Sequence, residues 1–468
     1  MVANKRLLAL SLALLGGCSL APTYQRPAIS TPAAFKAAPW QPAGSNVAPS
    51  GKWWEAFGDP ALTALEERID KGNFDLAAAS ARYQQALGAA RQARGDLFPQ
   101  VGASTSIERQ RQSANRPNSP GTPSTFTDKA IGASLSYELD LFGQVRNRVA
   151  AGDASAKAAA FDVDGIRLGL QTQLASTYFD LRGLDARITL LKQTVASYQR
   201  AFDLTDTRHS GGIASGIDVS RAQTQLSSAK SELSTVEIDR AQDEHAIAVL
   251  VGEAPETFTI PVADQQLRPP IIAAGLPSTL LERRPDIAAA ERRVAAANAE
   301  IGVAKAALFP NITLGGAAGY EAAGGSWLSA PSTFWALGPL EAVLSIFDGG
   351  KRRAGVKIAR AQYDEAAANY RQTVLTAFRE VEDDLAAQRL LIAGEADQAE
   401  ATRAAERTRD LALTRYHDGA SDYLEVVLAQ TAALDAERSL LQLRARQLQV
   451  ASDTFRALGG GLGTSASR

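Results

Sequence analysis

The sequence predicts a mixed α/β membrane protein in which one structural unit occurs twice, with long helices and four membrane-crossing strands in each chain. Three observations support this fold class. A helix-turn-helix signature is repeated, apolar residues follow heptad spacing over long segments, and four short segments alternate apolar residues with small or polar ones. Neither copy of the unit contains a chemical motif, so the duplication indicates an architectural role rather than an enzyme.

The repeated signature begins with Thr-Arg and continues through a glycine turn into a second helix. Thr207 corresponds to Thr414 and Thr224 corresponds to Thr431, a displacement of 207 residues in both cases. A unit of this length is far longer than the repeat of a solenoid protein. We expect a first repeat, a linker, a second repeat and a disordered tail, at 53–251, 252–276, 277–459 and 460–468.

The first seventeen residues predict a signal peptide, with a positive start, an apolar run over 7–15 and two glycines before the cleavage point. The apolar run is shorter than the roughly 20 residues that a membrane-spanning helix needs. Cys18 follows, and Leu15-Gly16-Gly17-Cys18 resembles a bacterial lipobox. We therefore expect lipidation at Cys18 and an N-terminal tether over 18–52. The alternative is an ordinary signal peptide that ends near a cysteine.

The composition argues against several classes of partner and site. Lys and Arg number 49 against 51 Asp and Glu, and a net charge of −2 gives no reason to expect a nucleic acid partner. A single cysteine allows no intramolecular disulfide. The three histidines have no metal-ligand spacing, and no nucleophile or base cluster is present. We expect no metal, no cofactor and no catalytic residue.

Heptad stripes predict long coiled-coil helices that bury a narrow face. The stripes consist of Leu174, Leu181, Ile188, Val195 and Phe202, and of Val427, Leu434, Leu441, Leu448 and Phe455. A helix over 141–207 would be about 100 Å long at about 1.5 Å per residue, and one over 350–415 would match it. The other expected helices are about half as long, at 61–97, 218–250, 276–308 and 424–458. Two short helices end to end would equal one long helix, which favours a tall cylinder.

Four segments with a period of two predict strands, near 98–108, 130–140, 311–320 and 336–347. Their length suits a tilted strand that crosses a bilayer, and their two faces suit lipid outside and water inside. A soluble sheet is the alternative, but it needs a hydrophobic partner layer. Four strands cannot close a barrel, and lipid does not tolerate open edges. Two chains would give a narrow eight-stranded barrel and three would give twelve strands, which favours a trimer.

Taken together, these features resemble the TolC-like outer membrane efflux family, in its lipoprotein branch that works with resistance-nodulation-division (RND) pumps. The specific motifs are Trp53-Trp54 with Phe57-Gly58-Asp59-Pro60, the segment Leu280–Ile287, Leu308-Phe309-Pro310 and the two glycine turns. The resemblance implies a homotrimer with a twelve-stranded barrel in the outer membrane lipid and a helical tunnel that crosses the periplasm.

Its implied partners are a periplasmic adaptor (membrane fusion) protein and an inner membrane RND pump. The implied function is a passive exit duct for drugs or other small toxic compounds, lipid-anchored in the cell outer membrane. One alternative is a lipid-anchored periplasmic coiled-coil structural protein, and another is an exit duct for a secreted protein.

The resemblance also implies a closed gate at the periplasmic tip, where the two glycine turns lie. Asp218 and Tyr416 match two residues that link neighbouring coiled coils, and Glu425 matches a constricting acidic ring. Ser421 stands where the type member has a linking arginine, so Asp422 is the substitute candidate. For Asp218 and Glu425 the alternative is a solvated charge at a helix start, where the macrodipole favours acidic residues.

Overall fold

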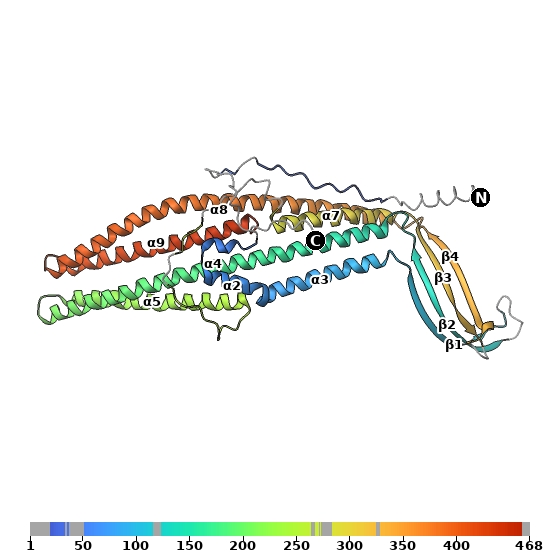
Figure 1. Cartoon of the computed structure of the whole chain (residues 1–468), viewed down its shortest axis with the longest axis horizontal. Helices are drawn as coiled ribbons and strands as arrows, with labels where there is room; N and C mark the ends of the chain where they lie inside the picture. The colour runs from blue at the N-terminus through green and yellow to red at the C-terminus, as the bar shows by residue number, and fades with distance from the viewer. Residues whose placement is uncertain are drawn as a thin grey trace. The chain divides into compact units, whose positions relative to one another are not determined.

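The structure is a computed structural model that describes residues 19–32, 35–36, 51–115, 123–263, 267–270, 272, 283–323 and 328–460 (Figure 1). The chain divides into two compact units. The first comprises Met1–Ala28, Arg82–Ala160 and Ala289–Arg371, and the second comprises Ile29–Ala81, Phe161–Ala288 and Gln372–Arg468. Each unit takes segments from both sequence repeats. The units therefore do not coincide with the repeats, because strands from both halves of the chain pair in one sheet.

The long helices confirm the duplication residue by residue. Helices α4 (Gln144–Ser210) and α8 (Lys351–His417) each contain 67 residues and are displaced by 207 positions at both ends. The helices that follow, α5 (Gly216–Val251) and α9 (Tyr423–Ala457), begin with the same displacement. The two long helices begin one to three residues later than predicted. Of the helices in the described part of the chain, none combines the length and apolar character needed to cross a membrane.

The helix predicted over 61–97 is wrong, because two helices occupy this segment, α2 (Pro60–Gly72) and α3 (Phe74–Gly95). Asn73 separates them with an extended backbone at ψ 122°. Its side-chain amide donates to the carbonyl oxygen of Leu250 at 2.9 Å, and its side-chain oxygen accepts from the backbone N–H of Leu76 at 2.9 Å. These buried hydrogen bonds stabilise a new helix start in place of a continuous helix.

Helix α7 (Pro285–Ala306) is the described part of the helix predicted over 276–308, whose residues 276–282 lie outside the described residues. Two short 3-10 helices complete the helical elements described, η1 (Trp53–Phe57) and η2 (Ala330–Ser332).

Four antiparallel strands form one sheet in the order of the chain, β1-β2-β3-β4. The strands are β1 (Gln100–Gln112), β2 (Ser124–Glu138), β3 (Asn311–Ala322) and β4 (Thr333–Val343). Three strands differ from their predicted bounds of 98–108, 130–140 and 336–347. β1 and β2 extend four and six residues further at their loop ends, and β4 begins three residues earlier and ends four residues earlier. β4 takes in Thr333 to Trp335 and stops before the chain turns at Gly349 and Gly350, where φ is positive.

The strand register places most of the large apolar residues of the four strands on one face of the sheet, whereas Phe126 and Phe334 lie on the other face. Val101 pairs with Leu135, Ile131 pairs with Tyr320, and Ala318 pairs with Trp335. Because paired residues point to the same side, the alternation predicted from the sequence builds a single apolar face. Trp335 and Leu337 are 81% and 79% exposed in the chain. Within the described residues β1 and β4 each pair on one side only.

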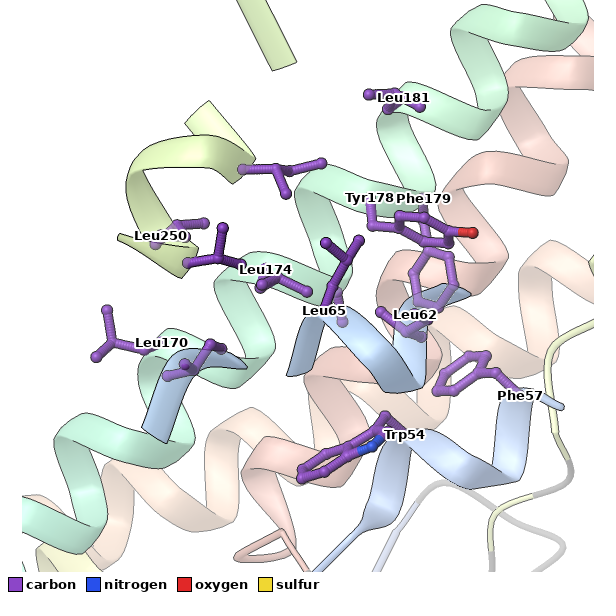
Figure 2. Close-up of a cluster of buried hydrophobic side chains, with 14 of the residues drawn as sticks. Trp54, Phe57, Leu62, Leu65, Leu170, Leu174, Tyr178, Phe179, Leu181 and Leu250 are labelled. Atoms are coloured by element: carbon purple, nitrogen blue, oxygen red, sulfur yellow. The ribbon is translucent and has the colours of Figure 1, made fainter. Parts of the chain in front are cut away.

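The largest hydrophobic core belongs to the second unit and surrounds the Trp-Trp motif. The ring of Trp53 lies 5.3 Å from that of Phe455, and the ring of Phe57 lies 4.7 Å from that of Phe179. Figure 2 shows Phe57 and Phe179 in this cluster, with Leu174 and Leu181 along α4. Both leucines belong to the first heptad stripe and are completely buried. The stripe therefore packs as predicted.

Candidate functional site

The turns that end α4 and α8 have the same backbone conformation. Gly212 and Gly419 both have φ +74°, a left-handed value that favours glycine. The carbonyl of Arg208 accepts from the N–H of Ile213 at 2.8 Å, and that of Arg415 accepts from Ala420 at 2.8 Å. The duplication therefore extends to the hydrogen bonds of the predicted gate region. Differences between the turns arise from their side chains.

Asp218 lies in the first turn of α5 and forms a capping box with Ser215. The hydroxyl of Ser215 donates to the Asp218 carboxylate at 2.8 Å and accepts from the N–H of Asp218 at 3.2 Å. Arg221 lies 3.6 Å from the same carboxylate. Within one chain Asp218 thus has the helix-start role that was the alternative to a gate role.

Asp422 and Glu425 occupy the equivalent places at the start of α9, 207 residues after Ser215 and Asp218. The Asp422 carboxylate accepts from the backbone N–H of Glu425 at 3.1 Å and caps the helix. The Glu425 carboxylate lies 3.5 Å from the guanidinium of Arg415, and both side chains are well exposed. The start of α9 therefore carries two carboxylates where the start of α5 carries one.

Tyr416 lies near the end of α8 and is buried against Tyr423, with ring centroids 5.3 Å apart. Its phenol oxygen lies 3.3 Å from the hydroxyl oxygen of Thr205. Within one chain the phenol of Tyr416 therefore meets Thr205, and the link between neighbouring coiled coils that the family resemblance implies stays a prediction. Burial raises the pKa of Tyr423 to about 12, with smaller contributions from Tyr416, Tyr198 and Asp218, so this phenol stays neutral at physiological pH.

Sequence reasoning missed Arg208, which crosses from the end of α4 to the end of α8. Its guanidinium donates to the carbonyl oxygens of Tyr416 and His417 at 2.8 and 2.7 Å. It also lies 4.7 Å from the centroid of the Tyr416 ring. The repeated Thr-Arg pair was visible in the sequence. Which arginine reaches the other hairpin depends on tertiary structure.

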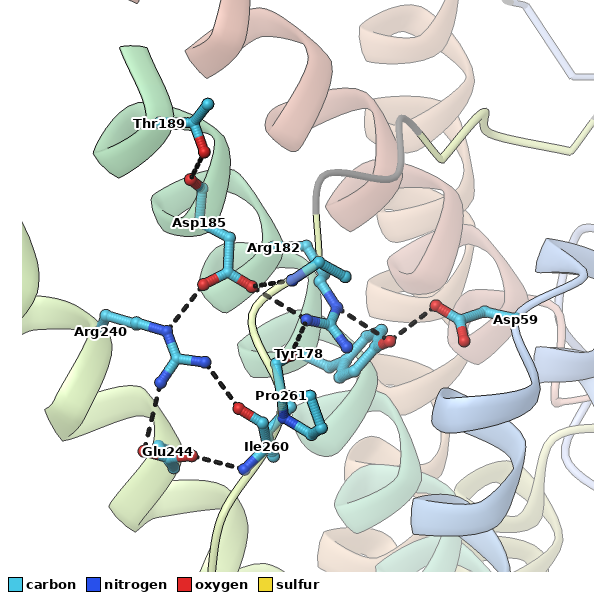
Figure 3. Close-up of polar contacts among 10 residues, drawn as sticks. Asp59, Tyr178, Arg182, Asp185, Thr189, Arg240, Glu244, Ile260 and Pro261 are labelled. Carbon is cyan, nitrogen blue, oxygen red and sulfur yellow. Dashed lines mark hydrogen bonds and ion pairs between the residues drawn. The ribbon is translucent and has the colours of Figure 1, made fainter. Parts of the chain in front are cut away.

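A buried charged network holds the middle of the second unit. Asp185 has no exposed surface and accepts from Arg182 at 2.9 Å and from Arg240 at 2.7 Å. Arg240 also donates to the carbonyl of Ile260 at 2.7 Å, which fixes the segment after α5 (Figure 3). The two guanidinium groups donate to the buried carboxylate and to backbone carbonyls, so the charges of the network are paired and it positions the helices.

The motifs that carry the family resemblance have structural roles. Asp59 caps α2 by accepting from the N–H of Ala61 at 2.8 Å, and its other oxygen accepts from the phenol of Tyr178 at 2.6 Å. Arg284 is buried and donates to Glu380 and Asp286, both at 2.7 Å. These contacts explain the Gly-Asp-Pro and Arg-Arg-Pro-Asp sequences as helix starts tied to neighbouring helices.

Several predicted features lie outside the described residues. They are the signal peptide over 1–17, Cys18, residues 33–34 and 37–50 of the tether, residues 280–282 of the Leu280–Ile287 segment, and residues 461–468 of the tail. Across the residues that are described, the structure contains no cluster of three His, Cys, Asp or Glu side chains that could hold a metal ion.

Comparison with known proteins identifies the family. The model of the family "Outer membrane efflux protein" matches residues 66–253 and 276–461, one stretch in each repeat. The chain belongs to this family. It is an outer membrane efflux channel and not an enzyme, and its long helices, four strands and duplicated halves are the TolC-like fold predicted from the sequence.

Two characterised relatives cover almost the whole chain. The toluene efflux pump outer membrane protein TtgC of Pseudomonas putida is 33% identical over 471 aligned positions, covering 97% of this chain and 95% of that protein. Outer membrane protein OprJ of Pseudomonas aeruginosa is 34% identical over 467 positions, with the same coverage.

Solved structures agree with the fold. The outer-membrane channel OprN superposes with a TM-score of 0.89 at 30% identity, covering 95% of this chain and all of that chain. The CmeC outer membrane channel of Campylobacter jejuni gives a TM-score of 0.87 at 25% identity, covering 96% of each chain.

Proposed function

We propose that this efflux channel is the passive exit duct of a tripartite system, delivering drugs or other small toxic compounds across the outer membrane. It takes its cargo from an inner membrane RND pump through a periplasmic adaptor protein. The relatives named for toluene and antibiotic efflux support this class of cargo. The chain contributes a path and no energy source of its own.

The observation that carries the proposal is the four-stranded sheet with one apolar face and two edges. An edge strand in a bilayer leaves N–H and C=O groups without partners, at a cost of several kcal/mol for each group. The edges of β1 and β4 must therefore pair with further copies of the chain. Three copies supply twelve strands, which is wide enough for a lumen. The functional form is a homotrimer whose apolar face meets the outer membrane lipid.

The proposal includes a lipid anchor at Cys18. The lipobox-like sequence before this residue supports it, as does Ser19 after it, because an aspartate there usually directs inner membrane retention. An acyl anchor supplements the barrel and does not replace it. Mass spectrometry of the mature N-terminus tests this part. An unmodified thiol at Cys18, or a chain that starts elsewhere, would refute lipidation.

The proposal also places the gate at the two glycine turns. Threefold symmetry would bring three copies of Asp422 and Glu425 together, and such a ring attracts cations. Asp218 and Tyr416 are proposed to limit movement of the hairpins, Asp218 by holding the start of α5 and Tyr416 through its contact with Thr205. Both contacts lie within one chain, so they support the gate by stiffening each tip.

Conductance in planar lipid bilayers tests the duct against the structural-protein alternative. Purified protein should form cation-preferring channels after insertion, and chemical cross-linking should yield a trimer. A trimer that inserts but never conducts, even after the tip is loosened by substitution, would contradict the duct. Export of a secreted protein predicts a specific protein missing from the culture medium of a deletion strain, while drug efflux predicts increased drug sensitivity.

A further inference from the structure

The two repeats differ in what the arginine of the Thr-Arg signature contacts. Arg415, in the second repeat, stays within its own hairpin, 3.5 Å from Glu425 and 3.5 Å from the carbonyl oxygen of Ala420. Arg208, in the first repeat, donates to Tyr416 and His417, which belong to the other hairpin. Because the two turns share one backbone conformation, this difference arises from how the two hairpins pack and not from the turns themselves. The duplication is symmetric in its backbone and asymmetric at this contact.

The partners of Arg208 are suited to a cation. The last carbonyl groups of a helix lack partners within the helix, and the negative end of the macrodipole lies there. Arg208 supplies two donors to these carbonyls of α8 and lies against the Tyr416 ring. One turn earlier, Thr205 contacts the phenol of the same tyrosine. The end of α4 therefore holds the end of α8 through backbone, ring and hydroxyl groups.

We propose that Arg208 holds the α4–α5 hairpin against the α8–α9 hairpin within each protomer, and that this contact breaks when the tip opens. The inference rests on the proposed function as a gated duct. A passage at the tip widens only if the hairpins move apart, and the guanidinium connects them from the last turn of α4. Arg208 is thus a positioning residue of the gate, separate from the acidic residues expected to line it.

The chemistry predicts a graded response to substitution. A guanidinium has a planar fork that reaches two carbonyl oxygens at once, whereas an ammonium reaches them only as a point charge. Arg208→Lys keeps the charge near the end of α8 and loses the paired geometry. Arg208→Ala loses both. Opening should therefore increase in the order parent, lysine variant, alanine variant.

Planar bilayer recordings and a distance measurement test this inference together. Arg208→Ala should raise the ratio of open to closed channels by roughly tenfold or more, since hydrogen bonds to a charged group are lost in each of three protomers. Arg200→Ala is the matched control, because Arg200 is exposed on the same helix two turns earlier. The control should record like the parent.

The distance measurement does not depend on conductance. Spin labels at Ser210→Cys and Asp418→Cys, in a Cys18→Ser background, report the separation of the two turns within one protomer. Labelled chains are diluted with unlabelled chains, so that pairs within a protomer dominate. Arg208→Ala should lengthen and broaden this distance, and Arg200→Ala should not.

Each outcome decides between the two proposals. If the parent and every variant fail to conduct, the duct is wrong, while the distances still judge the role of Arg208. If the parent conducts and folded Arg208→Ala trimers match it in conductance and distance, the role of Arg208 is overturned. If Arg208→Ala does not form trimers, Arg208→Lys is tested by conductance and by the spin-label distance. Values for Arg208→Lys that equal those of the parent overturn the inference.

Discussion

Gly72 and Gly252 meet backbone to backbone where the end of α2 passes the end of α5. A Cβ atom at Gly72 would lie 2.1 Å from the carbonyl oxygen of Val251, and one at Gly252 would lie 2.0 Å from the carbonyl oxygen of Gly72. No side chain fits between these segments. The same approach lets Asn73 reach the carbonyl of Leu250. Two glycines far apart in sequence therefore set where the chain breaks between α2 and α3.

Gly72→Ala should destabilise the protein, because the added methyl group forces two backbone segments apart. Overpacking of this kind costs typically about 1–3 kcal/mol or more. Gly88→Ala is the control, since a Cβ atom there meets nothing within 4 Å and alanine favours a helix. Denaturant unfolding followed by circular dichroism measures both. Equal stability of the two variants would show that the contact yields easily.

Asp185→Ala should cost about 3–5 kcal/mol, because it leaves the buried guanidinium of Arg182 without its carboxylate and Arg240 with Glu244 alone. The segment at Ile260 should also loosen, since Arg240 donates to its carbonyl. Asp410→Ala provides the comparison, because its side chain is 66% exposed beside Arg409 and should change stability by about 0.5 kcal/mol or less. Similar losses in the two variants would contradict a structural role for the buried network.

The long helices were predictable because their heptad stripes and turn residues are local signals that occur twice. The break at Asn73 was not, because its amide bonds to Leu250, which is 177 residues away. The presence of the strands was predictable from the alternation of apolar with small or polar residues. Where each strand ends depends on its pairing with the neighbouring strand. The loop end of β2 extends to Ser124 because that residue pairs with Gln112.

The residues of the candidate gate also divide into features that local sequence signals predict and features that depend on long-range contacts. Sequence reasoning placed Asp218, Tyr416 and Glu425 at the turns, because the displacement of 207 residues fixes their positions. It gave no indication that the phenol of Tyr416 meets Thr205 within the chain. It also missed Arg208, because an arginine before a glycine turn carries no information about the helix it will reach. The repeat therefore predicted where the gate residues lie along the chain, whereas their side-chain contacts depend on the tertiary structure.

Protein stability should depend on the protonation of Asp384, on α8. Burial, followed by the charge of Asp453, raises the pKa of Asp384 to about 7 from its ordinary value of 3.8. The folded state therefore holds a proton that the unfolded state releases, so this contribution to stability is full below about pH 4 and is lost as the pH rises through about 7.

Asp384→Asn should remove this pH dependence and raise the melting temperature at pH 8 by about a few degrees. Thermal unfolding between pH 5 and 8 measures the difference from the parent. Asp397→Asn, an exposed change on the same helix, should follow the parent curve. A parent curve that stays parallel to that of Asp384→Asn across this range would rule out the proposed titration.

Glu425→Ala should lower the preference of the channel for cations, because it removes one carboxylate per protomer from the proposed ring at the tip. The reversal potential across a salt gradient should fall towards zero, while trimer formation stays unchanged. Glu237→Ala is the control, since Glu237 is a half-exposed residue of α5 paired with Lys192 at 3.5 Å. An unaltered reversal potential for Glu425→Ala would place the narrowest ring elsewhere.

Gly302→Val should release the N-terminal segment from the first unit. A Cβ atom at Gly302 would lie 2.5 Å from the side-chain nitrogen of Asn147 and 2.7 Å from the Cβ of Ala21. Asn147 accepts a hydrogen bond from the hydroxyl of Ser19 at 3.0 Å, so the glycine leaves room for the residues that follow Cys18. The segment continues to Tyr24, whose phenol contacts Glu291 on α7.

A larger side chain at Gly302 would collide with Ala21 of the segment and with the side chain of Asn147, whose hydrogen bond to Ser19 holds the start of that segment. Chymotrypsin should therefore cleave after Tyr24 faster in Gly302→Val than in the parent, as measured by mass spectrometry of the released fragment. Gly355→Val is the comparison, because a Cβ atom there meets nothing within 4 Å. Equal cleavage rates in the two variants would mean that Gly302 does not seat the segment. Faster cleavage only in Gly302→Val would show that this glycine fixes the segment from Ser19 to Tyr24 against α4 and α7.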